Sequence, residues 1–146
     1  MSDSISTNNA PKPVGSYPHA RRVGDLLFLS GVGPRVAGSG ESDSQVPGLE
    51  LSPDGRVIKY NMAMQVHAVF ANVKAVLEAS GSSWEELVDV TVFLTNMAED
   101  FAEFNRIYAE YFSDLGDNRP CRTTLEVNCL PTPIAIELKC IATIKR

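Results

Sequence analysis

A strict alternation of apolar residues near the C-terminus constrains the fold more than any other feature of this 146-residue chain. From residue 134 to residue 144, every second position is apolar: Ile134, Ile136, Leu138, Cys140, Ala142 and Ile144. Side chains alternate between the two faces of a strand, so this pattern predicts a strand with one apolar face. Glu137 and Lys139 then point to the opposite face. The strand must therefore belong to a sheet that packs its apolar face on a core. The polar face of that sheet is left for water, a ligand or another subunit.

A second strand is predicted around Arg122, just before this one. Alternation places Arg122, Thr124 and Glu126 on one face, and a Pro-Thr-Pro turn at residues 131–133 separates the two strands. A hairpin would bring Arg122 beside Glu137 on the face that no helix covers. A guanidinium there can hold an anionic group by two parallel hydrogen bonds, and a neighbouring carboxylate can transfer protons. The alternative is that Arg122 and Glu137 form a structural ion pair.

Two helices are predicted from apolar residues at helical spacing. The first has the stripe Met62, Val66, Val69, Phe70, Val73, Val76 and Leu77, and Gly81 is its expected stop. The second runs from about Asp100 to Phe112, with the stripe Phe101, Phe104, Ile107, Tyr108 and Tyr111. Further strands are predicted at 26–29, 57–58 and 88–94, a helical turn from Ser83, and a long loop at 35–56. We expect a single mixed α/β domain over residues 14–146, preceded by a flexible lead-in at 1–13.

Composition excludes several classes of function. The net charge is -5 and no basic run occurs, which argues against nucleic-acid binding. No apolar stretch is long enough to cross a membrane, and the first 13 residues lack a hydrophobic signal core, so a cytoplasmic protein is expected. The three cysteines lack metal-site spacing; Cys129 and Cys140 are expected in the core, and Cys121 could be a reactive thiol. We expect neither a metal nor an organic cofactor.

A set of short fragments, taken in order, resembles the RidA-type family, also called the YjgF family. The fragments, which together span nearly the whole chain, are Gly15-Ser16-Tyr17-Pro18, Leu29-Ser30-Gly31, Val90-Thr91-Val92-Phe93-Leu94, Asp100-Phe101-Ala102 through Asn105 to Tyr108, Arg119-Pro120-Cys121-Arg122-Thr123-Thr124 and Ile136-Glu137-Leu138. One departure is Thr124, where many members of the family carry cysteine. The resemblance rests on the order of the fragments and on the spacing from Arg122 to Glu137.

The resemblance implies an α+β, chorismate-mutase-like fold, in which two helices pack on one face of a sheet. It also implies a homotrimer with a central barrel and with active sites between subunits. Many members hydrolyse enamines and imines to ketones and ammonia. By this resemblance Arg122 grips the substrate carboxylate and Glu137 orients or activates water. Other residues expected to line the cleft are Tyr17, Ser30, Gly31 and Asn105.

The long loop and the basic segment at residues 17–22 resemble one subgroup, the 2-aminomuconate deaminases. This implies hydrolysis of 2-aminomuconate to 4-oxalocrotonate and ammonia in bacterial aromatic catabolism, by a trimer or a hexamer. A dicarboxylate needs a second cation, and the candidates are His19, Arg21, Arg22 and Arg35, of which Arg21 and Arg22 should lie on opposite faces. The alternative for each is a solvated surface charge. Two other functions stay open: a general deaminase of reactive 2-imino acids and a non-catalytic ligand-binding trimer.

Overall fold

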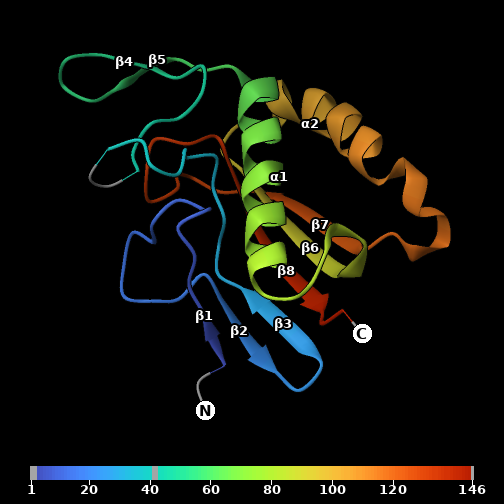
Figure 1. Cartoon of the computed structure of the whole chain (residues 1–146). Helices are drawn as coiled ribbons and strands as arrows, with labels where there is room; N and C mark the ends of the chain where they lie inside the picture. The colour runs from blue at the N-terminus through green and yellow to red at the C-terminus, as the bar shows by residue number, and fades with distance from the viewer. Residues whose placement is uncertain (1–2, 41–42, 146) are drawn as a thin grey trace.

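The computed structural model describes residues 3–40 and 43–145, and it has the predicted mixture of one main sheet and two helices (Figure 1). The main sheet has six strands in the order β1-β2-β3-β8-β6-β7. Its strands are β1 (Ser4–Ile5), β2 (Ala20–Val23), β3 (Leu26–Leu29), β6 (Leu87–Leu94), β7 (Cys121–Glu126) and β8 (Ile136–Thr143). The other elements are the hairpin of β4 (Glu50–Leu51) and β5 (Val57–Lys59), helices α1 (Met62–Ala79) and α2 (Met97–Phe112), and the short helices η1 (Trp84–Glu86) and η2 (Ser113–Asn118).

The order of the strands corrects the predicted hairpin. β7 pairs in parallel with β6, whereas β8 pairs antiparallel with β6 on its other side and with β3. β6 therefore separates the two strands that carry Arg122 and Glu137. The cause is α2, which connects β6 to β7: a helical crossover returns the chain in the same direction and so produces a parallel pair. The Pro-Thr-Pro segment at 131–133 leads across the sheet rather than closing a hairpin.

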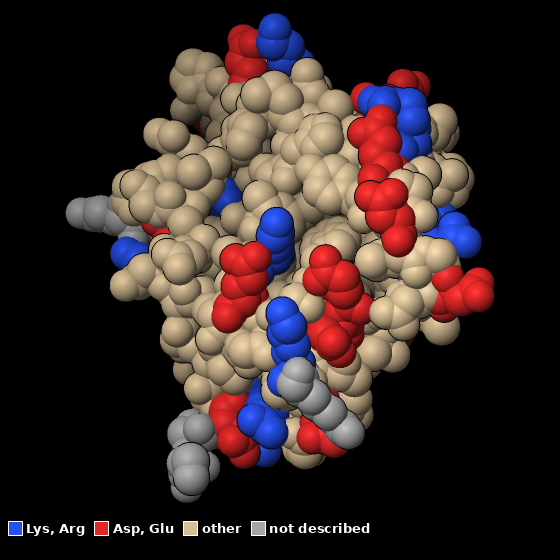
Figure 2. Space-filling view, turned by 45° about the vertical axis from the view of Figure 1, so that its right-hand side comes forward, with Lys and Arg blue, Asp and Glu red and all other residues tan. Residues whose placement is uncertain are grey.

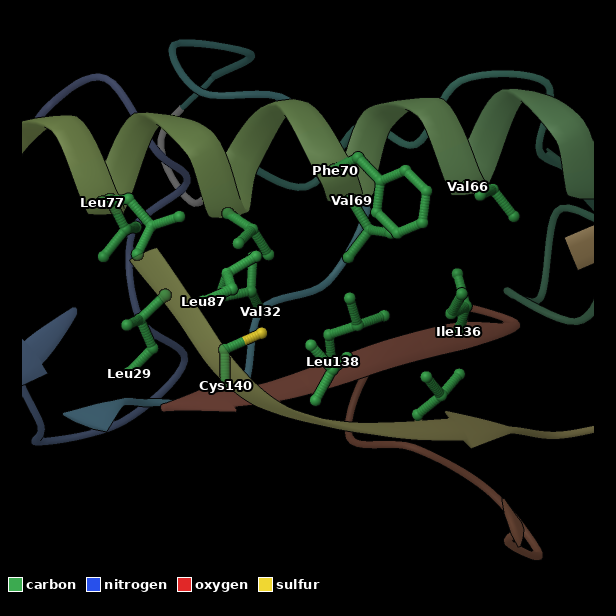
Figure 3. Packing of buried hydrophobic residues seen from close by; sticks show 14 of the residues in the cluster. Leu29, Val32, Val66, Val69, Phe70, Leu77, Leu87, Ile136, Leu138 and Cys140 are labelled. Atoms are coloured by element: carbon green, nitrogen blue, oxygen red, sulfur yellow. The ribbon is translucent and has the colours of Figure 1, made fainter. Parts of the chain in front are cut away.

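The apolar faces of the strands and helices meet in one core. Ile136, Leu138 and Cys140 on β8 point toward α1, where they face residues such as Val66 and Val69 (Figure 3). All five are at most 1% exposed. The predicted alternation of the last strand and the predicted stripe of the first helix are thus confirmed, and each buries the other. Helices cover only this face of the sheet (Figure 1).

An asparagine side chain caps the N-terminus of each α-helix. The Asn61 side chain accepts a hydrogen bond from the Met64 amide at 2.9 Å and begins α1, and Gly81, with φ of 76°, adopts the left-handed conformation that ends it. Helix α2 begins at Met97, earlier than predicted, because Asn96 caps it by accepting from the Glu99 amide at 3.3 Å. Asparagine at this position satisfies an amide that has no partner within the helix.

Two segments that were expected to be irregular contain ordered structure. Within the predicted lead-in, β1 pairs with β2, and Ala10 is only 2% exposed. The predicted loop at 35–56 includes β4, which pairs with β5. Asp43 joins the two segments by accepting a hydrogen bond from the Lys12 amide at 2.9 Å. None of the helices in the described residues is long and apolar enough to cross a membrane.

Candidate functional site

A cleft of about 350 Å³ opens beside the end of β3 and brings together four of the predicted site residues. Tyr17, Ser30, Gly31 and Glu137 all line it. The remaining lining residues are Val14, Gly33, Arg35, Pro131, Thr132, Ile134 and Lys139. Residues between positions 14 and 35 thus meet residues between positions 131 and 139 in one concave site, as is usual for ligand sites.

The Glu137 carboxylate lies against Gly31 in the cleft. Backbone hydrogen bonds between Val32 and Leu138, at 2.8 and 2.9 Å, hold the chain after β3 against β8. A Cβ atom built on Gly31 would collide with the Glu137 carboxylate, so this approach requires glycine. Burial in the cleft raises the pKa of Glu137, and the nearby charge of Arg35 partly opposes this shift. Glu137 is therefore a stronger proton acceptor, when ionised, than a solvated glutamate.

Ser30 and Tyr17 form other parts of the cleft wall. The Ser30 hydroxyl donates to the Pro18 carbonyl at 2.7 Å, and the Ser30 amide donates to the His19 carbonyl at 3.0 Å. These bonds fix the segment that leads into Gly31. Tyr17 is 42% exposed, and its hydroxyl accepts a hydrogen bond from the Val14 amide at 3.3 Å. Its ring therefore lies at the open rim, where it can contact a ligand or a second copy of the chain.

Arg122 lies on the other side of the sheet, which corrects the expectation that it shares a face with Glu137. Arg122 is in register with Val90, a fully buried residue on the helix side, whereas Glu137 is in register with Phe93. The guanidinium carbon lies 4.6 Å from the ring centre of Tyr108, and the rings of Phe101 and Phe104 are also within cation–π range, at 5.9 and 5.4 Å.

The suggested ion pair between Arg122 and Glu137 is therefore absent within this chain. The ion pairs among the described residues are Asp54–Arg56, Glu50–Lys59, Glu103–Arg106 and Arg106–Glu110. Asn105 follows Phe104 on α2 and has an exposed side chain. Arg122 and Asn105 thus belong to the α2–β7 edge of the molecule, away from the cleft.

Of the four candidates for a second cation, only Arg35 lines the cleft. Its guanidinium donates to the carbonyls of Asp43 and Lys12, at 3.1 and 2.6 Å, and ties the long loop to the N-terminal segment. His19 accepts at Nδ1 from the Thr7 amide at 3.2 Å, and its Nε2 bonds the Pro11 carbonyl at 2.8 Å.

Arg21 and Arg22 are exposed on β2. They lie on opposite faces as predicted, because Arg21 pairs with Phe28 and Arg22 with the buried Leu27. Lys139 is the residue that the sequence reasoning missed. It lines the cleft, and its ammonium donates to the Leu29 carbonyl. The available signal was its place two residues after Glu137 on the same strand face.

The cysteines and possible metal ligands add little to the site. Cys140 is buried in the core as expected, and burial raises the pKa of its thiol to about 12. Cys129 is exposed, contrary to the expectation, and so is Cys121. Within residues 3–40 and 43–145, no three histidine, cysteine, aspartate or glutamate side chains gather as metal ligands would.

Comparison with known proteins places this chain among a large set of relatives. The family model described as Endoribonuclease L-PSP matches residues 7–144. A RutC family protein of Pyrococcus horikoshii is 38% identical over 143 residues, which cover 97% of this chain and 98% of that protein. Protein HMF1 of Saccharomyces cerevisiae is 36% identical, covering 94% and 92%. Reactive Intermediate Deaminase A of Arabidopsis thaliana is 34% identical, covering 96% of this chain and 65% of that protein.

Solved structures share the fold at similar levels of identity. The YjgF gene product of E. coli superposes with a TM-score of 0.79 at 31% identity and covers 99% of this chain and 100% of its own. TdcF of E. coli, solved with bound serine, also gives a TM-score of 0.79, at 28% identity, and covers 97% and 98%. The arrangement of one sheet and two helices is therefore that of these proteins.

Proposed function

The chain belongs to the RidA/YjgF/L-PSP family, and from this premise we propose that it is a hydrolytic deaminase of 2-imino and 2-enamine acids. The family includes a relative named as a reactive intermediate deaminase. The observation that carries the proposal is the half-buried carboxylate of Glu137, held against Gly31 in a cleft of ligand size. A carboxylate whose pKa is raised by burial is suited to accepting a proton from water.

The reaction needs little more than this group and an oriented substrate. An enamine first becomes an imine by protonation at carbon. Glu137 takes a proton from water as the water oxygen attacks the carbon of the protonated imine, and the resulting tetrahedral adduct carries both a hydroxyl and an amino group. Glu137 returns this proton to the amino nitrogen. As the C–N bond breaks and ammonia leaves, the hydroxyl proton passes back to Glu137, and a 2-oxo acid remains. Holding the imine carbon beside the water is worth several kcal/mol, on the order of 7 or more in favourable cases.

Arg122 enters this proposal from a neighbouring copy of the chain. Arg122 and Glu137 lie on opposite sides of the sheet in one copy, so a site that uses both requires two copies. Arg122 sits on β7, the last strand of the sheet, where a neighbour can approach. The three aromatic rings beneath its guanidinium keep it extended and oriented for a bidentate contact with a carboxylate.

The assembly that we propose is a homotrimer, with pairing into a hexamer as a further possibility. The sheet face opposite the helices carries half-buried apolar side chains: Phe28, Phe93, Leu125 and Ile141. A sheet face with this much apolar surface gains stability when another copy covers it. Three such faces around one axis would form the central barrel expected from the family resemblance, and the clefts would lie between subunits.

The L-PSP description would also suggest a ribonuclease, but the charge of the protein favours the deaminase. A ribonuclease needs a surface that attracts phosphates. This chain has a net charge of -5, and on the face shown in Figure 2 basic and acidic groups are interspersed rather than gathered into a basic patch. A fold relative was solved with bound serine, and a small amino acid matches the size and charge of a 2-imino acid.

Within this class, 2-aminomuconate is the finer candidate for the substrate. It is a conjugated enamine with a carboxylate at each end, so its tautomer is a 2-imino acid that can follow the same steps. A cleft that contains Arg35 and Lys139 as well as the proposed Arg122 of a neighbour offers more than one cation to such a dianion.

The deciding experiment measures ammonia release. 2-Iminopropionate, generated in situ by oxidation of alanine, should lose ammonia faster with enzyme than in buffer. A second assay should follow conversion of 2-aminomuconate by its absorbance. If the protein binds 2-oxo acids but accelerates neither reaction, it is a ligand-binding trimer instead of a deaminase.

A further inference from the structure

We infer that Lys139 determines specificity in this cleft by binding a second anionic group of the substrate. The inference rests on the proposed deaminase function, because it names the class of imine that the same site prefers. That class is the dicarboxylic 2-imino and 2-enamine acids. Lys139 is not one of the four basic residues expected to fill this role.

The position of Lys139 follows from the strand that carries Glu137. Both residues are on β8, two positions apart, and face away from the buried Leu138 and Cys140. Two residues of extended strand separate their Cα atoms by about 7 Å. Lys139 is therefore far enough from Glu137 to leave room for the reacting carbon, and near enough for one small molecule to contact both.

The ammonium is held in place without being neutralised. It donates one of its three N–H groups to the Leu29 carbonyl, which immediately precedes Ser30 and Gly31 in the cleft wall. None of the ion pairs found between described residues involves Lys139. A half-buried cation with this much hydrogen-bonding capacity left over attracts an anion more strongly than a solvated surface lysine does.

The charges lining the cleft favour the same class of ligand. Arg35 and Lys139 are cations, and Glu137 is the only carboxylate among the lining residues. Arg35 already donates to the backbone carbonyls of Asp43 and Lys12, and so connects the long loop to the N-terminal segment. If Arg122 of a neighbour holds the carboxylate next to the imine carbon, Lys139 remains to contact a carboxylate at the other end of the substrate.

The test compares two imines in the wild type and in Lys139→Met. 2-Iminosuccinate, from oxidation of aspartate, carries the second carboxylate, whereas 2-iminopropionate lacks it. We expect kcat/KM for 2-iminosuccinate to fall about 10- to 100-fold, the effect of losing a hydrogen bond between charged groups, while kcat/KM for 2-iminopropionate changes little. Lys139→Arg should retain most of the ratio between the kcat/KM values for 2-iminosuccinate and 2-iminopropionate. The control Lys74→Met, which removes one exposed lysine from α1, should leave this ratio unchanged.

A binding measurement separates this inference from the deaminase proposal. Oxaloacetate and pyruvate, the 2-oxo products, can be titrated calorimetrically into the wild type and Lys139→Met even if neither imine is hydrolysed. Weaker binding of oxaloacetate alone supports the inference. Equal losses for both ligands would mean that Lys139 only positions the Leu29 carbonyl, and no loss for either would mean that the second anion lies elsewhere. Both outcomes overturn the inference and leave the role of Glu137 untouched.

Discussion

Burial controls the proton chemistry of Glu137. Removal from water disfavours the charged carboxylate and raises its pKa, and Arg35 offsets only part of the effect. Activity that needs ionised Glu137 should therefore decline, as the pH falls, at a higher pH than an ordinary glutamate would give. In Glu137→Gln, kcat should fall on the order of a hundredfold, and this acidic limb should disappear. A pH profile of kcat/KM checks both, and an unchanged kcat would assign water activation to another group.

The same shift makes a prediction about stability. Because the pKa is raised in the folded state, the ionised carboxylate costs folding free energy at every pH above that pKa, and the cost vanishes below the ordinary value of 4.5. Glu137→Gln should therefore unfold at a higher temperature than the wild type at neutral pH. Below pH 4.5 the two melting temperatures should converge. A melting temperature that is lower in the variant at neutral pH would contradict the desolvation argument.

A substitution at Gly31 tests the contact that orients the Glu137 side chain. Gly31→Ala places a methyl group where the carboxylate now lies, so the flexible side chain must rotate away. Misplacing a catalytic group by about 1 Å can cost on the order of a hundredfold in rate, and we expect a loss of that order with little change in stability. The control is Gly55→Ala: Gly55 has φ of 84° and open space around it, so its replacement should lower stability and spare activity.

Among the secondary-structure elements, a partly buried hydrogen bond joins the segment before α1 to the first turn of α2. The Tyr60 hydroxyl donates to the Asp100 carboxylate at 2.6 Å, and Asp100 is only 5% exposed. Burial raises the pKa of Asp100, although the bond from Tyr60 opposes this. The N-terminal position of Asp100 on α2 also favours its negative charge.

Tyr60→Phe should destabilise the protein by about 1–3 kcal/mol, because it leaves a buried carboxylate without its donor. Denaturant unfolding measures the loss. The matched control is Tyr111→Phe, which removes a hydroxyl that bonds His67 at 2.6 Å in an exposed setting. Tyr111→Phe should lower the free energy of unfolding much less than Tyr60→Phe does. Equal losses in the two variants would mean that the burial of Asp100 does not contribute to the effect.

In the proposed trimer, the positions of Arg122 and Glu137 on opposite sides of the sheet predict that two inactive variants restore each other's activity. Arg122→Ala and Glu137→Gln should each be nearly inactive alone. Co-refolded in equal amounts, they should recover about a quarter of wild-type activity if each site takes one residue from each of two randomly mixed neighbours. Activity per site measures this, and sedimentation should show the trimer. No recovery in a confirmed mixed trimer, or an active monomer, would refute the shared site.

The sequence alone determined the buried faces of β8 and α1, but not the strands β1 and β4 or the side of the sheet on which Arg122 lies. The alternation of Ile136, Leu138 and Cys140 and the stripe of α1 are local periodicities, so they could be read without knowing any partner. The same holds for the alternation that places Arg21 and Arg22 on opposite faces. Residues that must approach closely, such as Gly31, were found only through the family resemblance, because a glycine in isolation does not reveal what it contacts.

The tertiary structure decided which strands are neighbours and which side of the sheet each charge occupies. The alternation of side chains along a strand predicts that Arg122 and Thr123 face opposite sides of the sheet. Only the crossover through α2 determines that β7 pairs with β6 and that Arg122 lies on the side covered by α2. The tertiary structure also brings Lys139 into the cleft beside Leu29, a residue 110 positions earlier in the chain. Pairing and packing depend on contacts between distant residues, and no local pattern carries that information.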